Sequence, residues 1–223
     1  MKKIILLFMM TLLTLVAWAD DSGTCGENLT WVYEKATGTL TISGTGEMIT
    51  FGNSNKPWDE YKNEIKTLII EEGVTSISDY SFSYYEKLTS AQLPESLREI
   101  GERAFERSGI TTLTLPNSIT KIKKAAFTGC INLKMINIPN NLSSLSEALF
   151  WGCTELTDID IPNNITSIGN NVFTQCSGLT TITLHEGITE IMSGAFSSCT
   201  GLTSMVIPNS VMEFGEGVFA SCI

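Results

Sequence analysis

Hydrophobic residues recur at a fixed spacing along the chain from residue 65 onward. Seven segments of similar pattern follow one another, and successive segments begin 22 or 23 residues apart. Their first residues are Ile65, Leu88, Ile110, Leu133, Leu156, Leu179 and Leu202. Each unit is too short to bury an apolar face alone, so the period predicts a repeat solenoid whose units stack and share one core.

Within one unit, the pattern predicts two short extended segments followed by a turn. The clearest copy, residues 156–178, reads Leu-x-x-Ile-x-Ile-Pro, then Ile-x-x-Ile, then Phe-x-x-Cys. Alternating apolar residues closed by Pro162 predict a strand with one buried face, because proline cannot continue a hydrogen-bonded ladder. Ile165 and Ile168 predict a second extended segment, and we expect a short helical turn at the phenylalanine.

A phenylalanine occupies the same place in every unit. The seven are Phe82, Phe105, Phe127, Phe150, Phe173, Phe196 and Phe219. Identical aromatic residues at a fixed period predict a structural ladder in which each ring packs between the rings of the units above and below. At about 4.8 Å per rung, seven rungs make a stack about 34 Å long.

Five of the six cysteines also recur with the repeat. They are Cys130, Cys153, Cys176, Cys199 and Cys222, each three residues after a phenylalanine. In an exported protein six cysteines would ordinarily suggest three disulfides, and that alternative stays open. Stacked rungs point equivalent side chains in the same direction, however, so we expect buried free thiols, with Cys25 also lacking a partner. Single thiols in a column, with one histidine in the chain, predict no metal site, and no cofactor is expected.

The N-terminal 64 residues precede the repeats and divide into two parts. Residues 1–19 contain two lysines, an apolar stretch and Ala17-Trp18-Ala19, the order typical of a signal peptide cleaved after Ala19. Residues 20–64 are expected to form a cap module over the solenoid of residues 65–223. Leu29, Trp31 and Tyr33 alternate with polar residues, and after a turn at 36–38 the alternation resumes, which predicts a β-hairpin.

Composition and charge limit the classes of function that the chain can have. Hydrophobic residues make up 43% of the chain and charged residues 17%, as in a globular protein. Removal of Lys2 and Lys3 leaves 12 basic and 24 acidic residues, a formal charge of −12. Nucleic acid is therefore not an expected partner, because phosphate binding needs clustered lysine and arginine. No segment after the signal peptide is apolar enough to span a bilayer.

The outward positions of the first strand in each unit are the candidate binding surface, which we call the strand face. Regular rows of this kind commonly form the recognition surface of solenoids, although a merely solvated sheet face remains an alternative. The strand face consists of Thr67, Ile69, Ser90, Gln92, Thr112, Thr114, Met135, Asn137, Asp158, Asp160, Thr181, Thr183, Ser204 and Val206.

Candidate catalytic groups are few. Asp158 and Asp160 would lie about 6.5–7 Å apart on one strand, near the carboxyl separation of an inverting glycosidase. The neighbouring rungs offer neither a basic residue nor an apolar wall to separate the roles of the two carboxyls. His185 replaces proline in a turn, where we expect it to be exposed, and a lone histidine defines no catalytic triad. We therefore expect no catalytic residues and no enzyme, with a secreted glycan-active enzyme as the remote alternative.

The repeat resembles the BspA-type leucine-rich repeats of bacterial surface and secreted proteins. The resemblance rests on Leu-Thr-Asp-Ile-Asp-Ile-Pro at 156–162, Ile-Thr-Ser-Ile-Gly at 165–169 and Ala-Phe-Ser-Ser-Cys at 195–199, and it extends into residues 23–46. It implies a β-rich leucine-rich repeat solenoid with short helical turns, seven rungs of 22–23 residues behind an N-terminal β-hairpin cap. It also implies adhesion to an extracellular host or bacterial protein or glycan, some relatives binding fibronectin. A structural spacer without its own ligand is the alternative.

Overall fold

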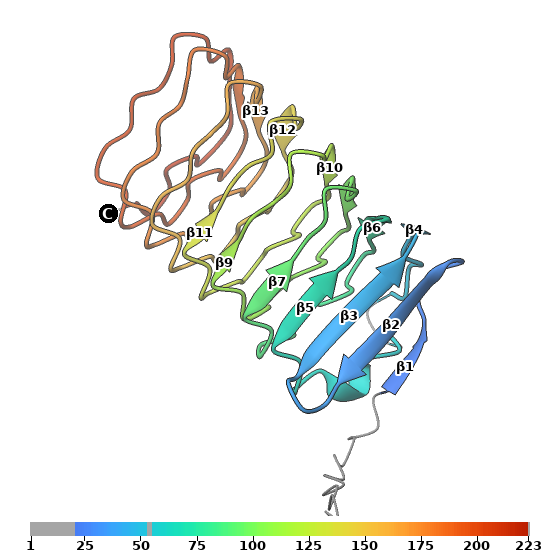
Figure 1. The fold of residues 1–223 in the computed structure, drawn as a ribbon. Coiled ribbons are helices and arrows are strands. Elements are labelled where there is room, and N and C mark those ends of the chain that lie inside the picture. Colours follow the sequence, from blue (N-terminus) through green and yellow to red (C-terminus); the bar gives the residue numbers. More distant parts are fainter. Residues whose placement is uncertain (1–20, 53–54, 223) are drawn as a thin grey trace, which may run out of the picture.

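A computed structural model describes residues 21–52 and 55–222 of the chain. The predicted signal peptide, residues 1–19, lies outside the described residues. Figure 1 shows the chain winding from an N-terminal antiparallel region through successive rungs, so that equivalent segments of each repeat lie side by side. The predicted repeat solenoid is confirmed.

The predicted hairpin is present, and it is continuous with the first solenoid sheet. Residues opposite each other in the antiparallel hairpin include Trp31 and Ile42, and the second hairpin strand then pairs in parallel with the first repeat, Leu40 opposite Leu68. The sheet has the order β1 (Asp21–Thr24), β2 (Leu29–Glu34), β3 (Thr39–Gly44), β5 (Thr67–Ile70) and β7 (Ser90–Gln92). Strands β9 (Thr112–Leu113) and β11 (Met135–Ile136) form a further parallel pair.

The first extended segment of the last three units is not a regular strand. Residues 158–160, 181–183 and 204–206 carry no strand assignment, so the strand prediction is wrong there in detail. The rungs still follow one another closely, because the Thr180 amide donates to the Thr157 carbonyl at 3.2 Å.

The second extended segment of each unit forms parallel ladders on another side of the solenoid. One sheet contains β4 (Gly46–Glu47), β6 (Val74–Ile77), β8 (Glu99–Ile100) and β10 (Lys121–Ile122). The other contains β12 (Ser144–Leu145), β13 (Ser167–Ile168), β14 (Glu190–Ile191) and β15 (Glu213–Phe214). Equivalent apolar residues face each other across rungs, for example Ile168 and Ile191, and point into the core.

The seven phenylalanines stack along the core as predicted. Neighbouring ring centroids lie 5.4–5.9 Å apart with interplanar angles of 8–26°. Trp58 extends the stack at its N-terminal end, 5.7 Å from Phe82, and its indole N–H donates to the Ser81 carbonyl at 3.2 Å. Six of the seven rings are fully buried, whereas Phe219 in the last rung is half-buried.

The phenylalanines sit in turns that are not helical. The one helix among the described residues is the 3₁₀ turn η1 (Asp59–Tyr61). Around each phenylalanine, the residues two before and two after have left-handed backbone, for example Ala125 (φ 56°) and Gly129 (φ 70°) around Phe127. With this backbone conformation, the amides of Ala125, Phe127 and Gly129 all point toward the next rung. There they donate to the carbonyls of Glu147, Leu149 and Trp151 at 2.6–3.1 Å. The predicted short helical turns are therefore flattened turns whose hydrogen bonds run between rungs.

The cysteine ladder follows from the same turns. All six cysteines are free. Each repeat cysteine donates its thiol to the phenylalanine carbonyl of the preceding rung, at 2.9–3.3 Å. Burial raises the pKa of Cys130 to about 11 and that of Cys199 to about 12. The thiols therefore point along the stack in one direction, which is the predicted arrangement, and Cys222 in the last rung is half-buried.

Candidate functional site

The strand face points outward, as the sequence predicts. Twelve of its fourteen side chains are exposed, and Thr67 and Ile69 are half-buried. Parallel pairing sets equivalent residues opposite each other, Thr67 with Ser90 and Met135 with Thr112. Met135 is 67% exposed and Val206 82% exposed, so the face offers apolar contact area to a partner. That a ligand binds this face stays a prediction.

Three polar residues of the strand face form hydrogen bonds within the protein. The Asn137 amide accepts from the Leu115 N–H at 2.7 Å and donates to the Leu115 carbonyl at 2.8 Å, so it extends the backbone ladder. Thr181 donates to Asp158 at 3.5 Å. Asp158 and Asp160 are both exposed, without the apolar surroundings that would give two carboxyls different roles.

The expectation that His185 is exposed is wrong. The side chain is half-buried in its turn. One ring nitrogen lies 3.0 Å from the Pro162 carbonyl, and the other accepts from the Gly187 N–H at 3.0 Å. His185 therefore connects two neighbouring turns, because the imidazole supplies two polar atoms where five of the other six units have proline and the first has Glu71.

A groove of about 780 Å³ runs along the edge formed by the phenylalanine turns, and sequence reasoning missed it. We call it the turn groove. Gly129 and Gly152, which leave two neighbouring rungs without a side chain, line it together with Arg107, Trp151 and Ile131. Polar side chains of the lining include Thr128, Asn132, Thr154 and Gln175, and charged side chains line the groove as well.

Comparison of equivalent positions shows that the fold does not require these residues. Trp151 follows its phenylalanine directly, a place that the other rungs give to Ser83, Glu106, Thr128, Thr174, Ser197 and Ala220. Ile131 follows its cysteine, where other described rungs have Glu86, Gly109, Thr154, Ser177 and Thr200. Trp151 is nevertheless 40% exposed and Ile131 55% exposed. Comparing the units column by column would have found this departure from the sequence alone.

Arg107 forms one wall of the turn groove. A Cβ atom at Gly129 would lie 2.7 Å from the Arg107 Cγ, so the missing side chain makes room for the arginine stem. The Arg107 guanidinium lies 5.3 Å from the Tyr84 ring centroid, and Lys62 lies at the same distance from that ring. Arg107 and Lys87 form no ion pair within the described part of the chain.

Two other cations near the groove are paired with carboxylates. Arg103 pairs with Glu106 at 2.9 Å, and the buried Glu106 also accepts from the Ser83 hydroxyl at 3.1 Å. Lys124 lies 3.5 Å from Glu102. These residues support the groove wall and leave Arg107 as its free guanidinium.

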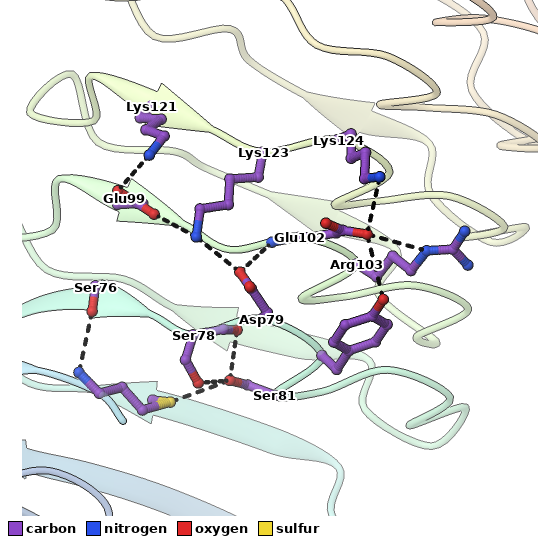
Figure 2. Close-up of polar contacts among 12 residues, drawn as sticks. Ser76, Ser78, Asp79, Ser81, Glu99, Glu102, Arg103, Lys121, Lys123 and Lys124 are labelled. Carbon is purple, nitrogen blue, oxygen red and sulfur yellow. Dashed lines mark hydrogen bonds and ion pairs between the residues drawn. The ribbon is translucent and has the colours of Figure 1, made fainter. Parts of the chain in front are cut away.

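A second charged cluster lies along β8 and β10 and in the segments that follow β6 and β10 (Figure 2). Lys123 bridges Asp79 at 3.1 Å and Glu99 at 2.9 Å, and Lys121 lies 3.3 Å from Glu99. Hydrogen bonding to Glu99 raises the pKa of Lys123. Partial burial pushes the pKa of Glu99 upward, but the hydrogen bonds from both lysines outweigh it and lower that pKa. The cluster satisfies its own charges across three rungs, which is a structural role.

Residues 21–52 and 55–222 contain no group of three or more histidine, cysteine, aspartate or glutamate side chains placed to hold a metal ion. Over the same ranges, no helix has the length and apolar character needed to cross a membrane.

Comparison with known proteins identifies the repeat. A model of the BspA type Leucine rich repeat region, in six copies, matches residues 60–143 and 99–223. The leucine-rich repeat protein TpLRR of T. pallidum is 23% identical, with a TM-score of 0.67 over 91% of this chain and 86% of its own. That likeness shows the fold.

Two other structures match with lower TM-scores. A leucine-rich cell surface protein of Faecalibacterium prausnitzii is 24% identical, with a TM-score of 0.36 over 65% of this chain and 60% of its own. The pneumococcal vaccine antigen PcpA is 15% identical, with a TM-score of 0.44 over 91% of this chain and 74% of its own. No protein of curated function matches the chain.

Proposed function

The chain belongs to the BspA-type leucine-rich repeat family, and on that premise we propose that it is a secreted or cell-surface bacterial binding module. Its partner is an extracellular host or bacterial protein or glycan, and the strand face is the contact surface. The observation that carries the proposal is the exposure of twelve strand-face side chains at equivalent places of successive rungs, with parallel pairing fixing the register of Thr67 with Ser90 and of Thr112 with Met135. A rigid row loses little conformational freedom on binding, which favours affinity.

Export and the absence of catalysis are parts of the same proposal. Lys2 and Lys3, the apolar residues 4–16 and the small residues before position 20 support export. Leucine-rich repeats typically present extended binding surfaces, which supports a binding role over an enzymatic one.

The test uses a double substitution at the centre of the strand face. Met135→Lys with Asp158→Lys replaces an exposed apolar side chain and a carboxylate where interface contacts contribute most. The purified protein is first measured against immobilised fibronectin and mucin. For whichever surface binds, the double variant should weaken binding at least tenfold, about 1.4 kcal/mol, with an almost unchanged melting temperature.

A charge-matched control separates the strand face from general electrostatics. Asn163→Lys with Glu213→Lys makes the same total change of charge at exposed positions of a turn and of β15, away from the strand face. The control should keep its affinity. Loss of binding in the control but not in the double variant would move the site to the turns. No binding to either surface would favour a structural spacer.

A further inference from the structure

We propose that the turn groove is a second binding site, independent of the strand face, and that it takes an oligosaccharide carrying an acidic group. Its volume of about 780 Å³ is within the range of small-ligand pockets. Trp151 stands where every other rung has a small or polar residue, and Gly129 and Gly152 leave two adjacent rungs of the groove without a side chain.

Trp151 supplies a platform for a sugar ring. Its indole N–H donates to the Gln175 side chain at 3.2 Å, which orients the exposed ring. A pyranose has an apolar face of C–H groups, which packs on an aromatic face, and a rim of hydroxyls, which needs polar neighbours. Thr128 and Thr154 donate their protons to backbone carbonyls at 2.6 and 3.2 Å, so their oxygens remain able to accept from sugar hydroxyls.

The backbone of the groove argues against a peptide that adds as a strand. Such a peptide needs unpaired N–H and C=O groups along an edge. Here the Gly129 N–H donates to the Trp151 carbonyl at 2.6 Å, and the Gly152 N–H donates to the Thr174 carbonyl at 2.8 Å. The backbone N–H groups of these two glycines are therefore already hydrogen-bonded between rungs. A ligand in the groove must be recognised by side chains.

Arg107 gives the groove its preference for an acidic group. A guanidinium can bind a carboxylate or a sulfate with two parallel hydrogen bonds. The groove is also lined by three further cations, Lys87, Arg103 and Lys124, and by three carboxylates, Glu86, Glu106 and Glu147. The sequence has no lysine or arginine after Lys134. Arg107 and Trp151 lie two rungs apart, roughly 10 Å, so a ligand that reaches both is longer than one sugar ring.

Calorimetric titration of the purified protein tests the proposal. The probes are hexasaccharides of hyaluronan, which carry carboxylates, and of heparin, which carry sulfates as well, with neutral maltohexaose for comparison. At least one acidic probe should bind more tightly than maltohexaose. Trp151→Ala should weaken that binding at least tenfold, and Arg107→Ala should weaken it while reducing the preference over maltohexaose.

Matched variants keep the result specific to the groove. Met212→Ala and Lys66→Ala remove an exposed apolar residue and an exposed cation elsewhere, and both should leave sugar binding unchanged. The strand-face double variant should also bind the sugar normally, so the two proposals can fail separately. If Trp151→Ala or Arg107→Ala lowers the melting temperature, Trp151→Phe and Arg107→Lys replace them, with partial retention of binding expected.

Several results would overturn the proposal. Failure of both acidic probes to bind is one, and equal binding of maltohexaose is another. Unchanged affinity in folded Trp151→Ala would place the sugar elsewhere. Binding of polyglutamate that depends on Trp151, with no binding of any oligosaccharide, would make the groove a site for acidic peptide segments.

Discussion

Replacing Phe173 by alanine removes one ring from the middle of the aromatic stack. Phe173 is fully buried, and its ring centroid lies 5.6 Å from that of Phe150 and 5.4 Å from that of Phe196. Lost burial of the side chain costs about 2 kcal/mol. A cavity of about 100 Å³, at about 24 cal/mol per Å³, adds up to about 2.4 kcal/mol when the neighbouring rungs do not relax into it. We expect a loss of about 3–5 kcal/mol in the free energy of unfolding.

Phe219→Ala is the comparison. Phe219 is half-buried and has a stacking neighbour on one side, Phe196 at 5.7 Å, with Phe214 tilted at 6.1 Å. The gap opens toward solvent, so the cavity contribution is small and we expect a loss of about 1–2 kcal/mol. Urea titrations followed by circular dichroism give both midpoints and slopes. Equal losses in the two variants would refute the reasoning that each ring is held by two neighbours.

Three other predictions concern the ladders and the ion pairs. Thiol titration in denaturant without reductant should find at least four free cysteines, with slow reaction in the native state because burial raises their pKa values, whereas three disulfides by mass would contradict the ladder. Ser198→Gly should raise the free energy of unfolding by about 0.5–1 kcal/mol, because Ser198 has φ 58° and glycine removes the strain of left-handed backbone; a lower urea midpoint would contradict this. Lys123→Ala should lower that free energy by about 0.5–1 kcal/mol, and by less in about 1 M salt. Because the pKa of Glu99 is lowered from 4.5 and that of Lys123 is raised from 10.5, this difference should hold across neutral pH. The difference in free energy between Lys123→Ala and the unchanged protein should shrink as pH falls through the folded pKa of Glu99 or rises through that of Lys123. A difference independent of both salt and pH would instead indicate lost packing of the lysine side chain.

The sequence by itself determined the period, the stacked rungs and the side of each rung that faces the core. It could do so because a repeat places each residue type in one column, and the phenylalanine column, for example Phe105, Phe127 and Phe150, is fully buried in every copy but the last. The outward direction of the strand face followed from the same alternation. The cysteine ladder could be predicted because stacking points equivalent side chains the same way.

Only the tertiary structure decided what depends on contact between one rung and the next. The left-handed backbone at Ala125 is tolerated because its amide finds the Glu147 carbonyl one rung on, at 2.9 Å. The side-chain amide of Asn137 forms two hydrogen bonds with the backbone of Leu115 in the preceding rung. The turn groove opens because glycines in adjacent rungs, Gly129 and Gly152, lie next to Trp151 and Arg107. Such features depend on pairs of residues 22 or more positions apart, and local pattern carries no information on how their side chains meet.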